Sequence, residues 1–167
     1  MRCRTKGQSL VEMALLLPLM LVVIFGIIDF GWYVYSYATV YMAARNGAEK
    51  ATMLPPMMSR VGSGLDMSDS NCVGSIVNAI GKSAPLFDDL ATPANISIRY
   101  PSGTRDTGEP IEVTVRYTVT PLTPLWNLIP FSDNNGEIVV SATTRRSIEV
   151  LGNNPNQRYA PNLTACN

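Results

Sequence analysis

Residues 7–28 read Gly-Gln-Ser-Leu-Val-Glu-Met-Ala-Leu-Leu-Leu-Pro-Leu-Met-Leu-Val-Val-Ile-Phe-Gly-Ile-Ile, and this stretch decides the fold. A helix of about 20 mostly apolar residues can span a bilayer, so the run from Leu10 predicts a membrane helix. Its only charged residue is Glu12. Because an ionisable group at bilayer depth costs roughly 2–4 kcal/mol, Glu12 indicates a task beyond anchoring. We expect Gly7, five residues before Glu12, to mark a site where the chain is cut. The Glu12 carboxylate could pair with the positive amino terminus that the cut creates.

Charge is unevenly placed around this run. Arg2, Arg4 and Lys6 precede it and no acidic residue does, so the positive-inside rule predicts a cytoplasmic N-terminus and a translocated C-terminal part. The whole chain has 13 basic and 13 acidic residues. Without its first seven residues it would carry about three net negative charges, which excludes an electrostatic footprint for nucleic acid.

Three regions follow from composition. Residues 1–7 form a short basic leader, and residues 8–51 form one helix whose second half projects from the membrane. Pro55 and Pro56 end that helix, because proline has no N–H to continue it. Residues 52–167 form an exported domain with an irregular C-terminal tail.

The exported domain is expected to be α+β. A short helix is predicted over 72–82, capped by Ser70 or Asn71. Alternating apolar and polar residues then predict an antiparallel sheet of three strands, over 95–100, 111–120 and 137–150.

Cysteine usage agrees with the topology. Cys3 lies in the leader, whereas Cys72 and Cys166 lie in the translocated part, where oxidation is permitted. We expect these two to form a disulfide that closes a long loop and could contribute about 4 kcal/mol. The alternative is two separate buried thiols.

The first 50 residues resemble the TadE-like family, minor pseudopilins of the tight-adherence (Tad/Flp) pilus. The resemblance rests on a set of motifs: Gly7, Val11-Glu12-Met13, Leu16-Leu17-Pro18, Phe25-Gly26, Asp29-Phe30-Gly31 and Ala43-Ala44-Arg45-Asn46-Gly47-Ala48. Met13, Asp29 and Asn46 depart from the family pattern, in which Phe or Tyr, Glu and Glu are usual.

The resemblance implies cleavage between Gly7 and Gln8 by a prepilin peptidase; otherwise Gly7 merely precedes the helix. Glu12 would meet a free α-amino group during assembly, or else snorkel to the cytoplasmic interface. Asp29 is either solvated among headgroups or holds a packing or partner contact. Arg45 binds the sheet domain or a neighbouring subunit, or it pairs with Glu49 four residues on.

Small and helix-bending residues are expected to mediate helix packing, because small residues let helix backbones approach closely. Proline is tolerated in membrane helices. The predicted packing residues are Pro18, Gly26, Gly31, Ala44, Gly47 and Ala48.

The predicted function is that of a minor pseudopilin-like subunit that supports assembly of a Tad/Flp-type pilus or related secretion apparatus. It would cross the bacterial inner membrane once, with its C-terminal domain periplasmic or extracellular. Expected partners are other pilins or pseudopilins, the prepilin peptidase and the inner-membrane pilus platform. The alternative is an uncleaved, membrane-anchored periplasmic binding or adaptor protein. Without histidine or a catalytic motif, the chain predicts no enzyme, cofactor or metal site.

Overall fold

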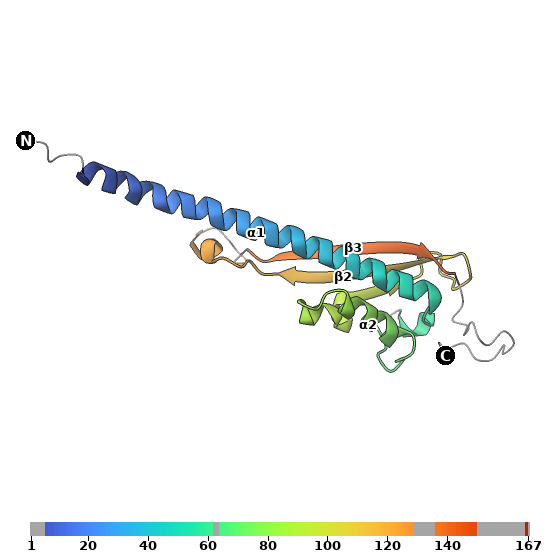
Figure 1. Cartoon of the computed structure of the whole chain (residues 1–167). Helices are drawn as coiled ribbons and strands as arrows, with labels where there is room; N and C mark the ends of the chain where they lie inside the picture. Colours follow the sequence, from blue (N-terminus) through green and yellow to red (C-terminus); the bar gives the residue numbers. More distant parts are fainter. Residues whose placement is uncertain (1–5, 62–63, 129–135, 150–165, 167) are drawn as a thin grey trace, which may run out of the picture. The chain divides into compact units, whose positions relative to one another are not determined.

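The computed structural model describes residues 6–61, 64–128, 136–149 and 166 (Figure 1). The predicted α+β class is confirmed: a long apolar N-terminal helix and a short helix accompany a three-stranded antiparallel sheet. The elements are α1 (Lys6–Met53), η1 (Met58–Arg60), α2 (Val73–Lys82), η2 (Asp88–Ala91), η3 (Pro93–Asn95), β1 (Ile96–Arg99), β2 (Pro110–Val119), η4 (Pro124–Leu128) and β3 (Ile138–Ser147).

The chain forms two compact units, and α1 contributes to both. Unit 1 comprises Met1–Tyr35 and Val119–Ile138, so it combines the N-terminal part of α1 with the connection between β2 and β3. Unit 2 comprises Ser36–Thr118 and Val139–Asn167 and holds α2 and most of the sheet.

Helix α1 has 48 residues and begins and ends within two residues of the predicted bounds. Pro18 lies inside it without ending it. The helix stops before Pro55 and Pro56, and its last turn is closed by the Leu54 N–H, which donates to the Lys50 carbonyl at 3.0 Å. Residues 1–5 of the predicted leader lie outside the described residues.

The sheet has the order β1-β2-β3. In the antiparallel β1–β2 pair, Ile96 lies opposite Val115 and Ile98 opposite Val113, and all four side chains are buried. On the other face the hydroxyls of Thr114 and Thr143 are 2.8 Å apart. This alternation is what the period-2 pattern predicts. The first two strands lie within a residue of their predicted bounds, whereas β3 ends at Ser147, before the predicted end at residue 150.

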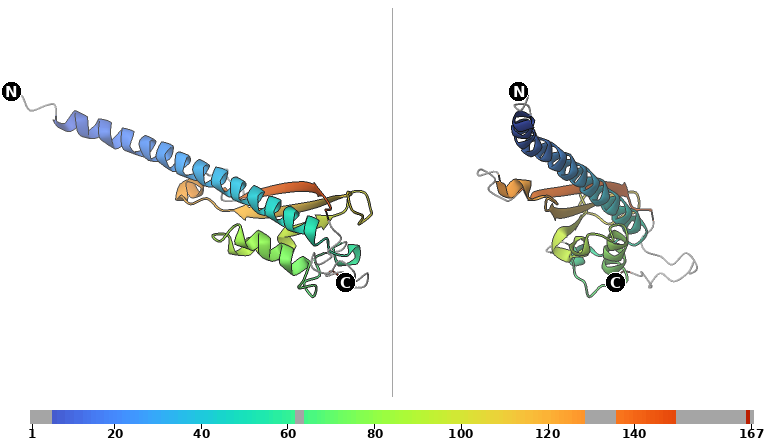
Figure 2. Two further views of the ribbon diagram at one scale, coloured as in Figure 1. Left: turned by 45° about the vertical axis from the view of Figure 1, so that its right-hand side comes forward. Right: turned by 60° about the vertical axis from the view of Figure 1, so that its left-hand side comes forward.

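The core of unit 2 lies between the C-terminal part of α1, α2 and the sheet. Figure 2 shows the strands running alongside that part of α1. Gly47 faces Ile80 of α2 and Val113 of β2, and both of these side chains are fully buried. Phe87 packs edge-on against Tyr117 of β2, with ring centroids 4.7 Å apart.

The cap of α2 differs from the prediction. Cys72 occupies the N-cap position, so the expected cap at Ser70 or Asn71 is wrong. The carboxylate of Asp69 accepts a hydrogen bond from the Cys72 N–H at 3.0 Å, and its carbonyl accepts one from Gly74. The acceptor therefore comes from a residue three positions before the cap, which satisfies donors that the first turn leaves free.

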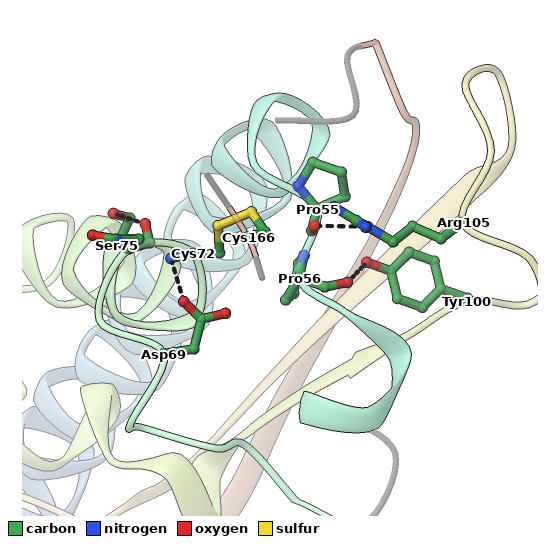
Figure 3. Close-up of a disulfide and its surroundings, with 9 residues drawn as sticks. Pro55, Pro56, Asp69, Cys72, Ser75, Tyr100, Arg105 and Cys166 are labelled. Atoms are coloured by element: carbon green, nitrogen blue, oxygen red, sulfur yellow. Dashed lines mark hydrogen bonds between the residues drawn. A yellow bond between two sulfur atoms is a disulfide. The ribbon is translucent and has the colours of Figure 1, made fainter. Parts of the chain in front are cut away.

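Within unit 2, a disulfide holds the start of α2, and two side-chain hydrogen bonds hold the proline pair that follows α1 (Figure 3). A disulfide joins Cys72 to Cys166 across 94 residues, with the Cα atoms 5.6 Å apart and both residues fully buried. The Tyr100 hydroxyl donates to the carbonyl of Pro56, and Nε of Arg105 donates to that of Pro55 at 2.9 Å. The turn that follows β1 therefore satisfies the carbonyls of the proline pair that ends α1.

Replacing Gly47 tests the closeness of α1 to the core. A Cβ at this position would lie 2.7 Å from Cγ1 and 2.8 Å from Cδ1 of Ile80, whose side chain is fully buried and would have to shift. We expect Gly47→Ala to lower the free energy of unfolding by about 1–3 kcal/mol despite the better helix propensity of alanine. The matched control is Gly31→Ala in the same helix, where a Cβ meets nothing within 4 Å. Urea denaturation followed by circular dichroism measures both; equal stability of the two variants contradicts the packing.

The second prediction concerns pH. Burial raises the pKa of Tyr100 from 10.0 to about 12, and the nearby Arg105 only partly opposes this. The fold thus favours the neutral hydroxyl: this contribution to stability is complete below pH 10 and is lost as pH rises through about 12. In an ultraviolet absorbance titration, Tyr100→Phe should remove a late-ionising tyrosine that Tyr37→Phe, at an exposed position, retains.

Candidate functional site

The N-terminal part of α1 offers a bare apolar surface. From Ser9 to Ile28 every side chain is exposed except Phe25 and Gly26, which are half-buried. The helix is long and apolar enough to cross a membrane, with a mean hydropathy of 2.7 in its most apolar window. About 20 residues at 1.5 Å each span roughly 30 Å, the thickness of a hydrocarbon core.

Glu12 lies on this exposed surface, near the N-terminal end of α1. Gly7 and Gln8, the predicted processing residues, lie in the first turn of the same helix. Gln8 precedes Glu12 by four residues, a spacing that places the two positions on one face. Within the described part of the chain, no salt bridge involves Glu12.

Asp29, the next residue after the bare surface, has a different environment. It is 1% exposed, and its carboxylate accepts four hydrogen bonds from the connection between β2 and β3. The backbone N–H groups of Leu122 and Thr123 donate to Oδ1, each at 3.0 Å. The Thr123 hydroxyl and Nε1 of Trp126 donate to Oδ2, the latter at 3.1 Å. All four partners are donors, so both oxygens of the Asp29 side chain act as hydrogen-bond acceptors.

Two aromatic residues on the same helix face extend this contact. Nε1 of Trp32 donates to the Thr120 carbonyl at 3.1 Å, and the Tyr33 hydroxyl donates to the Gly136 carbonyl at 2.5 Å. We call the contact of Asp29, Trp32 and Tyr33 with this connection the clasp; in Figure 1 the connection includes the short orange turn η4. Gly136 has φ +78°, and a Cβ there would meet the Trp126 ring at 2.5 Å, so this turn requires glycine.

One feature of the sequence, the spacing of Asp29, Trp32 and Tyr33, could have indicated the helix side of the clasp. Positions 29, 32 and 33 are related by steps of three and four, so they share a helix face. The groups that Asp29, Trp32 and Tyr33 bind lie about 90 residues later, in a proline-rich connection. That connection has no periodic pattern from which these contacts could be predicted.

The predicted packing residues fall into two groups. Ala44, Gly47 and Ala48 are buried in unit 2. A Cβ on Gly26 or Gly31 would meet nothing within 4 Å, and Pro18 is exposed. The first group therefore packs α1 against the chain's own domain, and only the second presents open helix surface.

Arg45 is exposed on α1, as is Glu49. Among the described residues neither takes part in a salt bridge, so the structure does not form the local pair that their spacing allows. No group of three or more metal-ligating side chains occurs in the part of the chain that the structure describes.

Asp29→Asn tests the clasp directly. The amide keeps the size of the side chain but turns one acceptor oxygen into a donor that faces other donors. Since a hydrogen bond to a charged group contributes about 1.5–3 kcal/mol, protection of the Leu122 and Thr123 amides should fall about 10- to 100-fold. Hydrogen–deuterium exchange with mass spectrometry of the full chain measures this.

The matched control is Asp66→Asn, which removes a half-buried carboxylate paired with Arg60 in unit 2. It should leave exchange at Leu122 and Thr123 unchanged. If Asp29→Asn also leaves it unchanged, the carboxylate does not hold the connection.

Comparison with known proteins gives a match that lies in the N-terminal helix. The family model described as TadE-like protein matches residues 7–49, which include Glu12, Asp29, Arg45 and the small residues. No curated protein and no solved structure matches the chain. The match ends shortly before the end of α1, so it covers the bare surface and the helix side of the clasp. The resemblance predicted from the sequence is therefore confirmed, and residues 7–49 form a TadE-like segment.

Proposed function

We propose that this chain is a minor pseudopilin-like subunit that supports assembly of a Tad/Flp-type pilus or a related secretion apparatus. The TadE-like match at residues 7–49 associates the chain with such a pilus system. The observation that carries the proposal is the bare apolar face from Ser9 to Ile28, preceded by Gly7 and interrupted only by Glu12. A helix that served its own domain alone would not need a lone carboxylate in that face.

In this proposal a prepilin peptidase cleaves after Gly7 on the cytoplasmic side of the inner membrane. Gln8 then carries a positive α-amino group at the start of α1. An unpaired carboxylate at membrane depth costs about 2.5–3.5 kcal/mol, which pairing with an amino group offsets. Glu12 pairs with its own new terminus or with that of a neighbouring subunit, so assembly replaces a costly exposed charge with a satisfied one.

The assembly surface of α1 is restricted by the fold. Ala44, Gly47 and Ala48 are already buried against the chain's own core. We infer that other pilins, pseudopilins or the pilus platform meet α1 at its bare part, where Gly26 and Gly31 allow close approach. Arg45, exposed and outside any described salt bridge, remains a candidate for contact with a neighbouring subunit.

Processing is tested by the N-terminus and by the thiol count. Cys72 and Cys166 form a disulfide, so a free thiol on the full-length chain comes from Cys3 in the leader. Coexpression with the prepilin peptidase should shift the start from Met1 to Gln8 and remove the maleimide-reactive thiol. Intact mass with N-terminal peptide mapping measures the first change.

Gly7→Leu should retain both the leader and the reactive Cys3, whereas Gly31→Ala, a glycine substitution far from the cut, should be processed normally. Glu12→Leu should be processed and inserted but should lose cross-links to copurifying pilins. A start at Met1 in cells that contain an active peptidase would refute the processed-pseudopilin function.

One observation favours the alternative, an uncleaved membrane-anchored binding or adaptor protein. A hollow of about 440 Å³ lies in unit 2 beside the edge strand β1. Its lining combines apolar side chains such as Met58 and Ile96 with the polar Ser97 and Arg99. The same N-terminal measurement separates the two functions, since the adaptor keeps its leader.

A further inference from the structure

The segment from Thr120 to Leu125, which the clasp holds, is unusually apolar for a surface connection. It reads Thr-Pro-Leu-Thr-Pro-Leu, and the sequence from Tyr117 to Ser132 has no charged residue. The side chain of Leu122 is 60% exposed, and Pro124 is also exposed. An exposed leucine alone is ordinary, but a charge-free run around it is not.

The backbone of this segment has no free N–H at four successive positions. Pro121 and Pro124 have no N–H, and those of Leu122 and Thr123 both donate to Asp29. Beside them, the Thr123 hydroxyl also donates to Asp29 and the Thr120 carbonyl accepts from Trp32. A segment in water needs no such arrangement, whereas one that faces hydrocarbon does, because each unsatisfied donor there costs several kcal/mol.

The clasp also sets where this segment lies along α1. Asp29 directly follows the bare run that ends at Ile28, and that run is about one hydrocarbon thickness long. Leu122 is therefore tied to the residue at which the span ends. Trp32 and Tyr33 follow within the next turn, and tryptophan and tyrosine are enriched at membrane interfaces.

We propose that the segment from Thr120 to Leu125 is a second membrane-contacting element, which rests its exposed Leu122 on the lipid at the C-terminal end of the span. The occupant is lipid rather than protein, because the surface is continuous with a span whose solvent is lipid. In this arrangement Asp29 satisfies the donors of a loop so that the loop can face an apolar phase. The proposal rests on the membrane location of α1 and not on the pilus role.

Spin labelling of the full-length protein in phosphatidylethanolamine–phosphatidylglycerol vesicles tests the proposal. In a Cys3→Ser background under non-reducing conditions, a label at Leu122→Cys is compared with labels at Leu19→Cys and Leu86→Cys. Leu19 lies in the bare run at 59% exposure, and Leu86 is a surface leucine of unit 2 at 69% exposure. Power saturation then measures access of oxygen, which partitions into lipid, and of a neutral nickel chelate, which stays in water.

We expect the Leu122 label to resemble the Leu19 label, with higher access to oxygen than to the chelate, and the Leu86 label to show the reverse. Adding Asp29→Asn should raise the chelate access of the Leu122 label, since the clasp no longer holds the segment. A Leu122 label that matches Leu86 would show a water-facing loop and overturn the proposal. A label shielded from both reagents would show a protein partner and overturn it too. If the Leu19 label also has higher access to the chelate, α1 does not span the membrane and the proposal is overturned. Processing after Gly7 is measured separately, so its result does not depend on this outcome.

Discussion

The buried carboxylate of Asp29 organises unit 1. It is the first polar side chain after a run of apolar residues, and it accepts four hydrogen bonds from a connection more than 90 residues away. A buried carboxylate without partners would be strongly unfavourable, so the donors and the acid require one another. Trp32 and Tyr33 add two hydrogen bonds on the same helix face, and both reach backbone carbonyls of this connection. The path of the chain between β2 and β3 depends on these contacts.

Helix α1 meets two environments, and its composition changes accordingly. Before Asp29 its side chains are bulky and exposed, which suits lipid. Further on, Ala43, Ala44 and Gly47 are fully buried in unit 2, which suits close packing against α2 and β2. Small residues four apart permit close approach of a helix to any partner, and here that partner is the chain's own core. The exposed part of α1 before Asp29 is therefore the part that the chain's own core does not cover.

Much of the secondary structure follows from local pattern. The alternation of Ile111, Val113 and Val115 with polar residues predicts a strand buried on one face, and β2 has that burial. Pro55 and Pro56 predict the end of α1 because neither can continue the ladder of hydrogen bonds. The location of Cys72 and Cys166 in one compartment predicts their pairing, and the structure joins them. The cap of α2 was missed because the acceptor, Asp69, lies three residues before the cap and acts through loop geometry.

The sequence alone determines the long apolar helix that could span a membrane, the TadE-like pattern of residues 7–49 and the α+β class, because each depends on composition or on local spacing along the chain. The roles of Asp29 and Gly47 are decided only by the tertiary structure. The sequence around a carboxylate at the end of an apolar run does not show whether water or a distant loop donates hydrogen bonds to it. A glycine in a helix permits close packing, but the sequence does not show which residue packs against it. Both roles depend on long-range contacts, with Leu122 in one case and Ile80 in the other, which no local periodicity encodes.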